Sequence, residues 1–478
     1  MVVTTGLEPV TRGSSGRCST NWATWPDIYY YITKCAIIAS MKAINTSPIS
    51  GMQELLPARQ AIFDQMKNEI ARVYHLHGFE SIETPVIDRT DILLAKAGGD
   101  TEKQIYKVVK TKEASEGSDQ ALRFDHTVPL ARYVVEHESQ LAFPFRATQI
   151  GRNFRGERAQ KGRFREFYQC DMDVIGRNDL PLSYDAEVIL TFLDAAKAIL
   201  SQKILIRVSN RKLLTGLVSG LGIKEKLPGI SSIIDHAEKV TPEKTSAALI
   251  EEGLSEAEKA KIETFMHISG TREETIARLK SLEISDPIFE EGIRELDEVL
   301  HLAEAGILEN DDPRDDEAII ADMMIIRGLD YYTGTVFETI LPDYKEIGSI
   351  GGGGRYENLT GYFTEQKFPG VGGSIGLTRL FYILSEYNLL KDEDFRPISY
   401  AIIPITASEQ PAALQLAAKL RKAGYSTDII LTDKRLSDRM THAAKIATSA
   451  VVLGESEVAT GDYMAKNLQT GEITPLKF

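Results

Sequence analysis

The chain has 478 residues, with 55 Lys and Arg against 69 Asp and Glu, and a formal net charge of −14. A sequence pI near 5.3 argues against a protein that binds nucleic acid through bulk positive charge, so any such partner must be held by local basic surfaces. The length permits two to four domains with large buried cores, and the hydrophobic content of 43% is typical of a globular protein.

The cysteine content indicates a cellular compartment. The three cysteines are Cys18, Cys35 and Cys170. They form neither a metal-binding spacing nor a disulfide framework, which favours a reducing compartment, so we expect a cytoplasmic protein. The sequence predicts no metal site built from protein ligands of known spacing.

Residues 1–45 differ from the rest of the chain. Both tryptophans lie there, beside a short apolar run at residues 28–39 that Lys34 interrupts. The run is too short to span a bilayer, and no clear secretory signal accompanies it. A few arginines and serines are faintly typical of a transit peptide. We expect instead an unstructured extension, which a start codon assigned upstream of Met41 would explain.

An amphipathic helix is predicted from Pro57 onward. Gly78 is a natural stop for it, and residues 79–87 are typical of a short strand that follows. The apolar residues at helical spacing are Phe63, Met66, Ile70, Val73 and Leu76.

Residues 145–176 concentrate positive charge on an otherwise acidic chain. The clustered cations are Arg146, Arg152, Arg155, Arg158, Lys161, Arg163 and Arg165. Apolar flanks and a polar middle with two glycines predict two strands joined by a charged turn. Guanidinium groups match phosphate oxygens two at a time, and aromatic residues alternate with them here. This pattern favours a nucleotide site over a solvated basic face.

The second half of the chain changes character twice. Glu- and Lys-rich amphipathic segments dominate residues 204–316 and predict a helical module. Strands and glycines then return, and the acidic stretch at residues 391–397 is typical of a linker. Alternating strand and helix patterns over residues 396–478 predict a small α/β domain.

Two segments carry a resemblance to a known family. The run FRGER at residues 154–158, followed by Phe167, resembles motif 2 of the class II aminoacyl-tRNA synthetases. Its continuation QKGRFREFYQ, at residues 160–169, is similar to the histidyl-tRNA synthetase version. The block RGLDYYTGTVFE at residues 327–338 resembles a histidine-specific signature of that family.

The resemblance implies a fold and a domain organisation. We expect an α+β catalytic core, an antiparallel sheet flanked by helices, from residues 46–203 and 317–392. A helical insertion would occupy residues 204–316, and an α/β anticodon-binding domain residues 396–478. The helix and strand at about residues 57–86 resemble motif 1, which implies a homodimer interface.

ATP with Mg²⁺ is the first substrate that the resemblance implies. Arg155 matches the motif 2 arginine that contacts the α-phosphate, and Arg327 would add a second cation there, so both are predicted to be catalytic. Thr378 departs from the family, which usually has Glu at that position. The predicted ATP-binding residues are Arg155, Glu157, Arg163, Phe167 and Arg379.

Histidine is the second implied substrate. A site that gives both imidazole nitrogens a partner rejects amino acids that lack them. Gln169 and Asp173 are an even number of residues apart and so lie on one face of a strand. The glycines at residues 351–354 would form an adjoining wall, and His126 is interpreted as incidental. The predicted histidine-binding residues are Asp125, Thr127, Arg155, Gln169, Asp173, Arg327, Tyr331 and Tyr332.

A tRNA partner is implied as well. Gln160 and Lys161, in the motif 2 turn, would approach the acceptor end. Lys434, Arg435 and Arg439 are candidates for contact with the anticodon side. Surface cations are usually only solvated, so the assignment of Lys434, Arg435 and Arg439 rests on position alone.

Two other functions fit parts of the sequence. A histidine-sensing regulatory relative, of the kind that partners a short ATP phosphoribosyltransferase, would lack the arginines and the C-terminal α/β domain, which are present here. A class II synthetase for another amino acid, such as proline or threonine, would leave residues 327–338 unexplained. The sequence therefore favours an enzyme that joins L-histidine to tRNA(His) through a histidyl-adenylate.

Overall fold

The computed structural model describes most of the chain. The described residues are 45–95, 99–110, 119–307, 318–326, 332–357, 359–390 and 396–476, without the side chains of 99–101. Apart from residue 45, the predicted extension at residues 1–45 lies outside them. The chain divides into two units, Met1–Ile49 and Ser50–Phe478, and the elements below all belong to the second.

A nine-stranded sheet forms the centre of the second unit, with the strand order β1-β5-β6-β12-β11-β10-β7-β9-β8. Its strands are β1 (Glu80–Ser81), β5 (Phe145–Phe154), β6 (Glu166–Ile175), β7 (Leu205–Asn210), β8 (Ser269–Gly270), β9 (Ile319–Asp322), β10 (Tyr332–Ile340), β11 (Gly351–Tyr356) and β12 (Gly370–Ile375). Neighbouring strands are antiparallel except for β1 with β5 and β7 with β9. The predicted α+β core with a mainly antiparallel sheet is confirmed.

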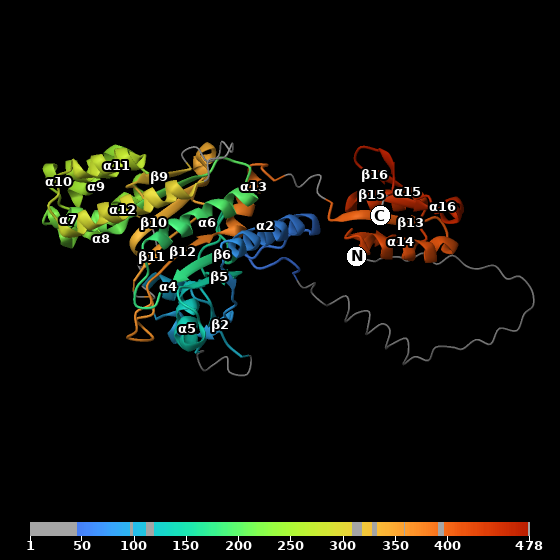
Figure 1. Ribbon diagram of the computed structural model, residues 1–478, viewed down its shortest axis with the longest axis horizontal. Helices are drawn as coiled ribbons and strands as arrows, with labels where there is room; N and C mark the ends of the chain where they lie inside the picture. The colour runs from blue at the N-terminus through green and yellow to red at the C-terminus, as the bar shows by residue number, and fades with distance from the viewer. Residues whose placement is uncertain are drawn as a thin grey trace, which may run out of the picture. The chain divides into compact units, whose positions relative to one another are not determined.

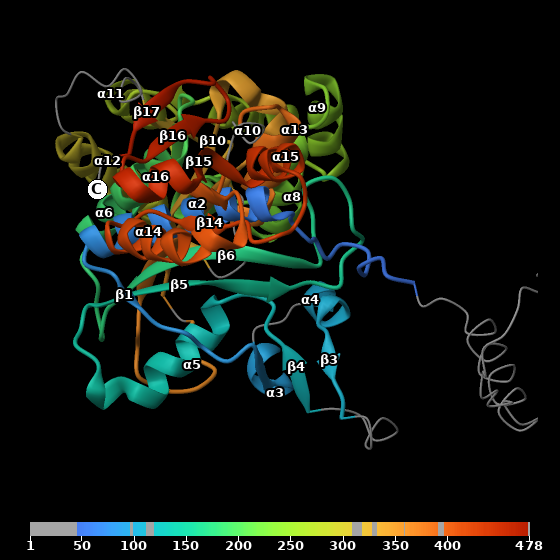
Figure 2. The ribbon, with the colours of Figure 1, turned by 90° about the vertical axis from the view of Figure 1, so that its right-hand side faces the viewer.

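The two strands predicted within residues 145–176 are the long pair β5 and β6. They run side by side in Figure 2, and their register extends from Phe145 opposite Ile175 to Phe154 opposite Glu166. The arginine-rich turn joins them at the end where Phe154 and Glu166 meet. The charged turn therefore lies at the end of a rigid two-stranded ribbon.

Helices cover one face of the sheet (Figure 1). They are α2 (Pro57–Leu76), α6 (Ser183–Ile199), α12 (Pro287–Gly306) and α13 (Leu377–Glu386). Proline suits the first position of α2 because the amide there has no intrahelical partner. The predicted apolar stripe of α2 is buried at Phe63, Met66, Ile70 and Val73, but Leu76 is exposed.

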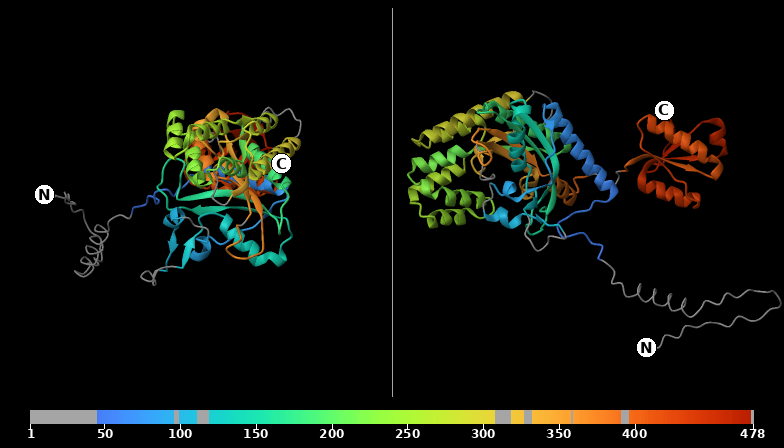
Figure 3. Two further views of the ribbon diagram at one scale, coloured as in Figure 1. Left: turned by 90° about the vertical axis from the view of Figure 1, so that its left-hand side faces the viewer. Right: turned by 90° about the horizontal axis from the view of Figure 1, so that it is seen from below.

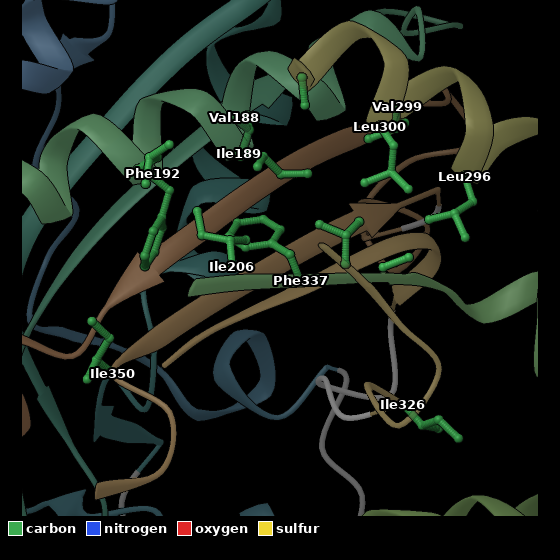
Figure 4. Close-up of a cluster of buried hydrophobic side chains, with 14 of the residues drawn as sticks. Val188, Ile189, Phe192, Ile206, Leu296, Val299, Leu300, Ile326, Phe337 and Ile350 are labelled. Atoms are coloured by element: carbon green, nitrogen blue, oxygen red, sulfur yellow. The ribbon is translucent and has the colours of Figure 1, made fainter. Parts of the chain in front are cut away.

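The core between these helices and the sheet is closely packed. Figure 4 shows side chains of α6 and of α12 directed at the strands, with Phe192 beside Phe337. The two rings meet edge to face, with their centroids 5.5 Å apart. A Cβ at Gly373 would lie 2.8 Å from the Phe337 ring, so glycine in β12 leaves room for this aromatic pair.

The predicted insertion begins later than residue 204. Leu205–Asn210 is strand β7, which pairs with β10 and β9 inside the sheet. The sequence pattern did not reveal this six-residue strand, because longer charged helical segments follow it. The last helix of the predicted module, α12, packs on α6 and β7 and so also covers the core. The intervening helices are α7 (Arg211–Gly220), α8 (Leu227–Ala237), α9 (Pro242–Glu251), α10 (Glu256–Met266) and α11 (Arg272–Lys280).

A small sheet lies beside β5 (Figure 2). It has the order β2-β4-β3 and consists of β2 (Ile87–Arg89), β4 (Gln120–Leu122) and β3 (Lys107–Val108), with helices α3 (Thr90–Leu93), α4 (Gly99–Gln104) and α5 (Thr127–His137) nearby. The segment between β4 and α5 is held along β5. Arg123 accepts a hydrogen bond from the Phe154 amide at 3.1 Å and donates one to the Arg152 carbonyl at 2.8 Å. This fixes the position of the residues that follow Arg123.

The C-terminal part is an α/β domain, as predicted. Its sheet has the order β14-β13-β15-β16-β17. The elements are β13 (Ile398–Pro404), α14 (Gln410–Lys422), β14 (Thr427–Ile429), α15 (Leu436–Ile446), β15 (Ala447–Leu453), α16 (Glu455–Thr460), β16 (Met464–Asn467) and β17 (Ile473–Pro475). Helices α14 and α15 cover opposite faces of its sheet (Figure 3). The antiparallel pair β16–β17 was not predicted.

Short 3₁₀ helices complete the described elements: η2 (Glu138–Gln140), η3 (Lys224–Lys226), η4 (Pro342–Ile347) and η5 (Ala407–Glu409). Among the helices of the described ranges, none combines the length and the apolar character that crossing a membrane requires.

Candidate active site

Side chains of strand β6 alternate between two environments. Cys170, Met172 and Val174 point into the core beneath α2 and α6. Since successive side chains of a strand point to opposite faces, Gln169, Asp171 and Asp173 lie on the other face. The predicted pair Gln169 and Asp173 therefore shares the face of the sheet that the covering helices leave open.

An open cavity of about 420 Å³ lies on this part of the molecule. All five predicted ATP-binding residues line it, together with Gln169, and they come from β6, the motif 2 turn and α13. Strands β11 and β12 supply the remaining wall through Gly351, Gly352 and Ser374. The lining residues used below are Arg155, Glu157, Arg163, Phe167, Gln169, Ser374 and Arg379.

Arg155 is held between two aromatic rings. Its guanidinium carbon lies 4.4 Å from the Phe124 ring centroid and 5.0 Å from that of Phe167. Its Nε donates a hydrogen bond to the Phe124 carbonyl at 3.3 Å. A guanidinium stays protonated at any working pH, and stacking on both sides restricts its plane. Arg155 therefore offers an oriented positive charge to the cavity.

The other charged residues of the cavity lining also have partners within the protein. Arg163 lies 3.5 Å from the Glu157 carboxylate, and Arg379 donates to the Ile347 carbonyl at 3.1 Å. Thr378, the departure from the family pattern, is buried, and its hydroxyl accepts a hydrogen bond from the Tyr168 amide at 2.8 Å. That bond joins α13 to β6 and so supports Arg379 from behind the cavity.

Gln169 has both ends of its amide bonded. Asn153 donates to its Oε1 at 2.8 Å, and its own Nε2 donates to the Ser374 hydroxyl at 2.9 Å. Ser374 in turn donates to Oδ1 of Asp171. Asn153 and Ser374 were not predicted from the sequence. Their roles depend on the pairing of β6 with β5 and β12, which local patterns do not reveal.

Asp173 lies deeper on the same face. Burial raises the pKa of its carboxyl to about 8, and the neighbouring Asp171 charge adds to the shift. Tyr356 donates its hydroxyl to Oδ1 of Asp173 at 3.0 Å. A Cβ at Gly372, opposite in the sheet, would fall 2.0 Å from that oxygen. Only glycine at position 372 therefore leaves room for the Asp173 carboxyl.

Asp125 and Thr127 flank the start of α5. The Asp125 carboxylate accepts a hydrogen bond from the Val128 amide at 3.1 Å. Burial raises the pKa of Asp125, while that hydrogen bond and the charge of Arg155 act in the opposite direction. Asp125 is thus within the electrostatic reach of Arg155. Between Asp125 and Thr127, His126 is fully buried.

The histidine-specific signature is described only in part. Arg327 and Tyr331 lie outside the described residues. Tyr332 begins β10, where it is partly buried against Tyr356. The glycines at residues 351–354 belong to strand β11, paired with the glycine-containing strand β12, and two of them, Gly351 and Gly352, line the cavity.

The predicted tRNA contacts divide into exposed and buried groups. Gln160 and Lys161 are exposed in the motif 2 turn, and Lys434 and Arg435 are exposed before α15. Arg439 is 8% exposed and donates to the Ile405 carbonyl at 3.1 Å. The prediction that Arg439 contacts tRNA is not supported, because its guanidinium is already used to hold the end of β13.

Comparison with known proteins gives a consistent family. Residues 51–380 match the profile described as histidyl-tRNA synthetase, and residues 399–478 match that of an anticodon binding domain. Histidine–tRNA ligases of Clostridium tetani and Finegoldia magna are 41% and 40% identical, over 90% of this chain and 95% and 96% of theirs.

Solved structures agree with this result. The histidyl-tRNA synthetase of Nostoc sp. PCC 7120 superposes with a TM-score of 0.82 at 35% identity, covering 91% of this chain and 97% of that one. An ATP phosphoribosyltransferase regulatory subunit/histidyl-tRNA synthetase of Bacillus halodurans has a TM-score of 0.68 at 20% identity, covering 86% and 100%, which shows a shared fold. The chain belongs to the histidyl-tRNA synthetase family.

Proposed function

We propose that this chain ligates L-histidine to tRNA(His), using ATP to form a histidyl-adenylate first. One observation carries the proposal: Arg155, Glu157 and Arg379, with the other predicted ATP-binding residues, line one cavity that Gln169 also lines. Two segments more than two hundred residues apart thus meet where a nucleotide and an amino acid would react. The family relationship supports the same reaction.

Adenylate formation needs the α-phosphate to be oriented and its developing charge stabilised. Arg155 suits this role because the Phe124 and Phe167 rings fix its plane. Phe167 would also stack on the adenine, with Glu157, Arg163 and Arg379 contacting the nucleotide. Arg327 would supply a second cation, an assignment that rests on the family motif alone.

ATP would enter as its magnesium complex. No group of three or more potential protein ligands for a metal occurs among the described residues. Mg²⁺ in nucleotide sites commonly takes most of its ligands from phosphates and water, with one or two carboxylates. Glu157, which lines the cavity and whose carboxylate lies 3.5 Å from Arg163, matches a family position that holds the adenine, so we propose that phosphate oxygens and water hold the ion.

The substrate histidine would be recognised beside the phosphate site. Gln169 and Asp173 share one face of β6, and we assign them to the amino group and the imidazole. Tyr332 would close the pocket from β10, and Tyr331 would do so by its place in the motif. Asp125 and Thr127 would hold the amino acid's backbone groups. A buried carboxyl suits an imidazole N–H because each group would satisfy the other.

For tRNA, we propose two separate contact regions. Gln160 and Lys161 project from the turn beside the cavity and would meet the acceptor end. Lys434 and Arg435 would contact the anticodon side from the C-terminal domain, residues 396–478, which matches an anticodon-binding profile. We place the reaction in the cytoplasm, because the three cysteines of the sequence form no disulfide framework.

We further propose a homodimer built through residues 57–86. Large apolar side chains are exposed on and beside this segment, among them Leu56, Leu76 and Ile87. The proposal is supported by the resemblance of this segment to motif 1, and a second copy would cover these side chains. Sedimentation velocity of the wild type should give a dimer, and Leu76→Glu should shift it toward monomer. A fully active monomer at nanomolar concentration would contradict the proposal.

ATP–pyrophosphate exchange measured with each of the twenty amino acids tests the ligase proposal. We expect exchange with histidine alone. A regulatory protein of this fold would bind histidine but give no exchange with any amino acid. A synthetase of different specificity would respond to another amino acid.

A further inference from the structure

His126 does not fit the role of an incidental residue. Its side chain is 1% exposed, although histidine is more often found partly exposed. The backbone around it is anchored as well, because Gln149 donates to the His126 carbonyl at 3.2 Å and Thr84 donates to Gln149 at 2.8 Å. A buried imidazole at a fixed backbone position can act on the groups that it contacts.

The contact that matters is with Asp171. Nδ1 of His126 lies 3.0 Å from Oδ2 of Asp171. A carboxylate only accepts hydrogen bonds, so Nδ1 must carry the proton and donate. Asp171 uses its other oxygen, Oδ1, to accept from Ser374. The two donors therefore fix the orientation of the whole carboxylate.

This chain of hydrogen bonds ends in the cavity. Ser374 accepts from Nε2 of Gln169 at 2.9 Å, and both residues line the cavity. The Ser374 hydroxyl has one proton, and since it is given to Asp171, its oxygen is free to accept from Gln169. The amide of Gln169 is thereby oriented. Asn153, which donates to the amide oxygen at 2.8 Å, fits the same orientation.

The fold provides a place for the imidazole. A Cβ at Gly151 of β5 would lie 3.2 Å from Nε2 of His126 and 2.5 Å from an Arg123 nitrogen. The missing side chain of Gly151 thus admits the ring between β5 and α5. Nε2 is buried and has no hydrogen-bond partner among the described residues, so Nδ1 makes the bond on which the arrangement depends.

We propose that His126 is a positioning residue for the amino-acid side of the reaction: through Asp171 and Ser374 it orients Gln169, and its own backbone places Asp125 and Thr127. This inference rests on the proposed function, because it takes Gln169 as a histidine-binding residue. His126 is not among the residues that line the cavity of the predicted ATP-binding residues, so we expect it to act through Gln169. Its loss should therefore weaken histidine binding and leave the ATP side nearly unchanged.

Two variants of His126 separate this role from a general structural one. His126→Leu puts an apolar side chain of similar size in place of the imidazole and so removes the Nδ1 donor. His126→Asn keeps an N–H at nearly the place of Nδ1 and can still donate to Asp171. Ile262→Val, in the buried part of α10 far along the chain, controls for ordinary loss of stability. KM for histidine and KM for ATP are measured in ATP–pyrophosphate exchange.

We expect His126→Leu to raise KM for histidine about tenfold, because Gln169 loses its fixed orientation but keeps its place beside the substrate. KM for ATP should change less than about twofold, and His126→Asn should recover most of the histidine affinity. The inference is overturned if His126→Leu and His126→Asn have the same KM for histidine. It is also overturned if His126→Leu raises KM for histidine and KM for ATP together, or if it changes neither.

Two further results distinguish failure of this inference from failure of the proposed function. If His126→Leu does not fold, Ser374→Ala breaks the same chain of hydrogen bonds at its cavity end. It should give the same selective rise in KM for histidine, and an unchanged KM would overturn the inference. If the wild type shows no histidine-dependent exchange, the proposed function fails, and the inference fails with it.

Discussion

Tyr356 of β11 donates its hydroxyl to Oδ1 of Asp173 in β6 at 3.0 Å, across the intervening strand β12. Both groups are buried, and the pKa of Asp173 is raised to about 8. In the absence of a ligand, the carboxyl is thus held in a place that favours its neutral form. Such a site is poorly suited to stability and well suited to receive a hydrogen-bonding side chain.

Asp173→Asn should stabilise the protein while impairing histidine binding. In the wild type, the folded state keeps the Asp173 proton between the ordinary pKa of 3.8 and about 8, whereas the unfolded state releases it. The free energy of unfolding therefore falls as pH rises, by at most about 1.4 kcal/mol per pH unit for this group. Asparagine removes that dependence.

Urea unfolding of both proteins at pH 5, 6, 7 and 8 measures the difference. The advantage of Asp173→Asn should increase with pH and level off above about pH 8. Other titrating groups are common to the two proteins and cancel in the difference. A difference that is the same at every pH would show that Asp173 does not titrate in this range in the folded protein.

Arg155→Lys should slow adenylate formation by on the order of 10²- to 10³-fold. Lysine keeps the charge but loses the planar fork that lies between the Phe124 and Phe167 rings. Single-turnover adenylate formation measures the step directly. Arg158→Lys, an exposed arginine in the same turn, is the matched control and should retain nearly the wild-type rate. Equal rates for the two variants would contradict the role of Arg155.

Asp185→Ala should destabilise the core by about 3–5 kcal/mol, since it removes the close carboxylate partner of the buried Arg355 guanidinium. Two backbone carbonyls and the Glu357 carboxylate at 3.9 Å would remain. Asp185 of α6 is fully buried and accepts from Arg355 of β11 at 2.7 Å and 3.0 Å. The exposed pair Arg435–Asp438, 3.2 Å apart, offers a comparison. Removing Asp438 should cost less than about 1 kcal/mol. Chemical unfolding measures the free energy of unfolding of both variants. Similar losses for the buried pair and the exposed pair would count against the prediction.

Arg439→Ala should affect the stability of the protein, whereas Lys434→Ala should affect tRNA binding. Arg439 donates to the Ile405 carbonyl from a buried position, so its loss should lower the unfolding midpoint of the protein. Lys434 is exposed, so its loss should raise KM for tRNA(His) and leave stability unchanged. Thermal unfolding and aminoacylation kinetics test the pair. If Arg439→Ala instead affected only KM for tRNA, our interpretation of that arginine would be wrong.

Sequence patterns predicted the parts of the site that are local. The strand pair around the arginine-rich turn follows from apolar flanks and glycines, and it delivers Arg155 and Gln169 to one place. The C-terminal alternation of strand and helix was likewise predictable from β13 to β15, because those elements have a clear period and clear ends.

What could not be predicted depends on contacts between distant segments. Ser374 meets Asp171 and Gln169 only because β12 pairs with β6 in one register. His126 could be recognised as significant only once Asp171 was placed beside it. Strand β7 was missed because a six-residue strand between helices has too little periodicity to stand out. The burial of Arg439 shows the converse, since a cation in a polar run is not always at the surface.

Transfer of labelled histidine to tRNA(His) is the measurement that tests the account most directly. Purified protein would be incubated with ATP, Mg²⁺, tRNA(His) and histidine, and acid-precipitable histidyl-tRNA counted, with a second tRNA and a second amino acid as controls. The account predicts label on tRNA(His) only, and only when ATP is present. Absence of charging by the folded wild type, or charging with another amino acid, would contradict it.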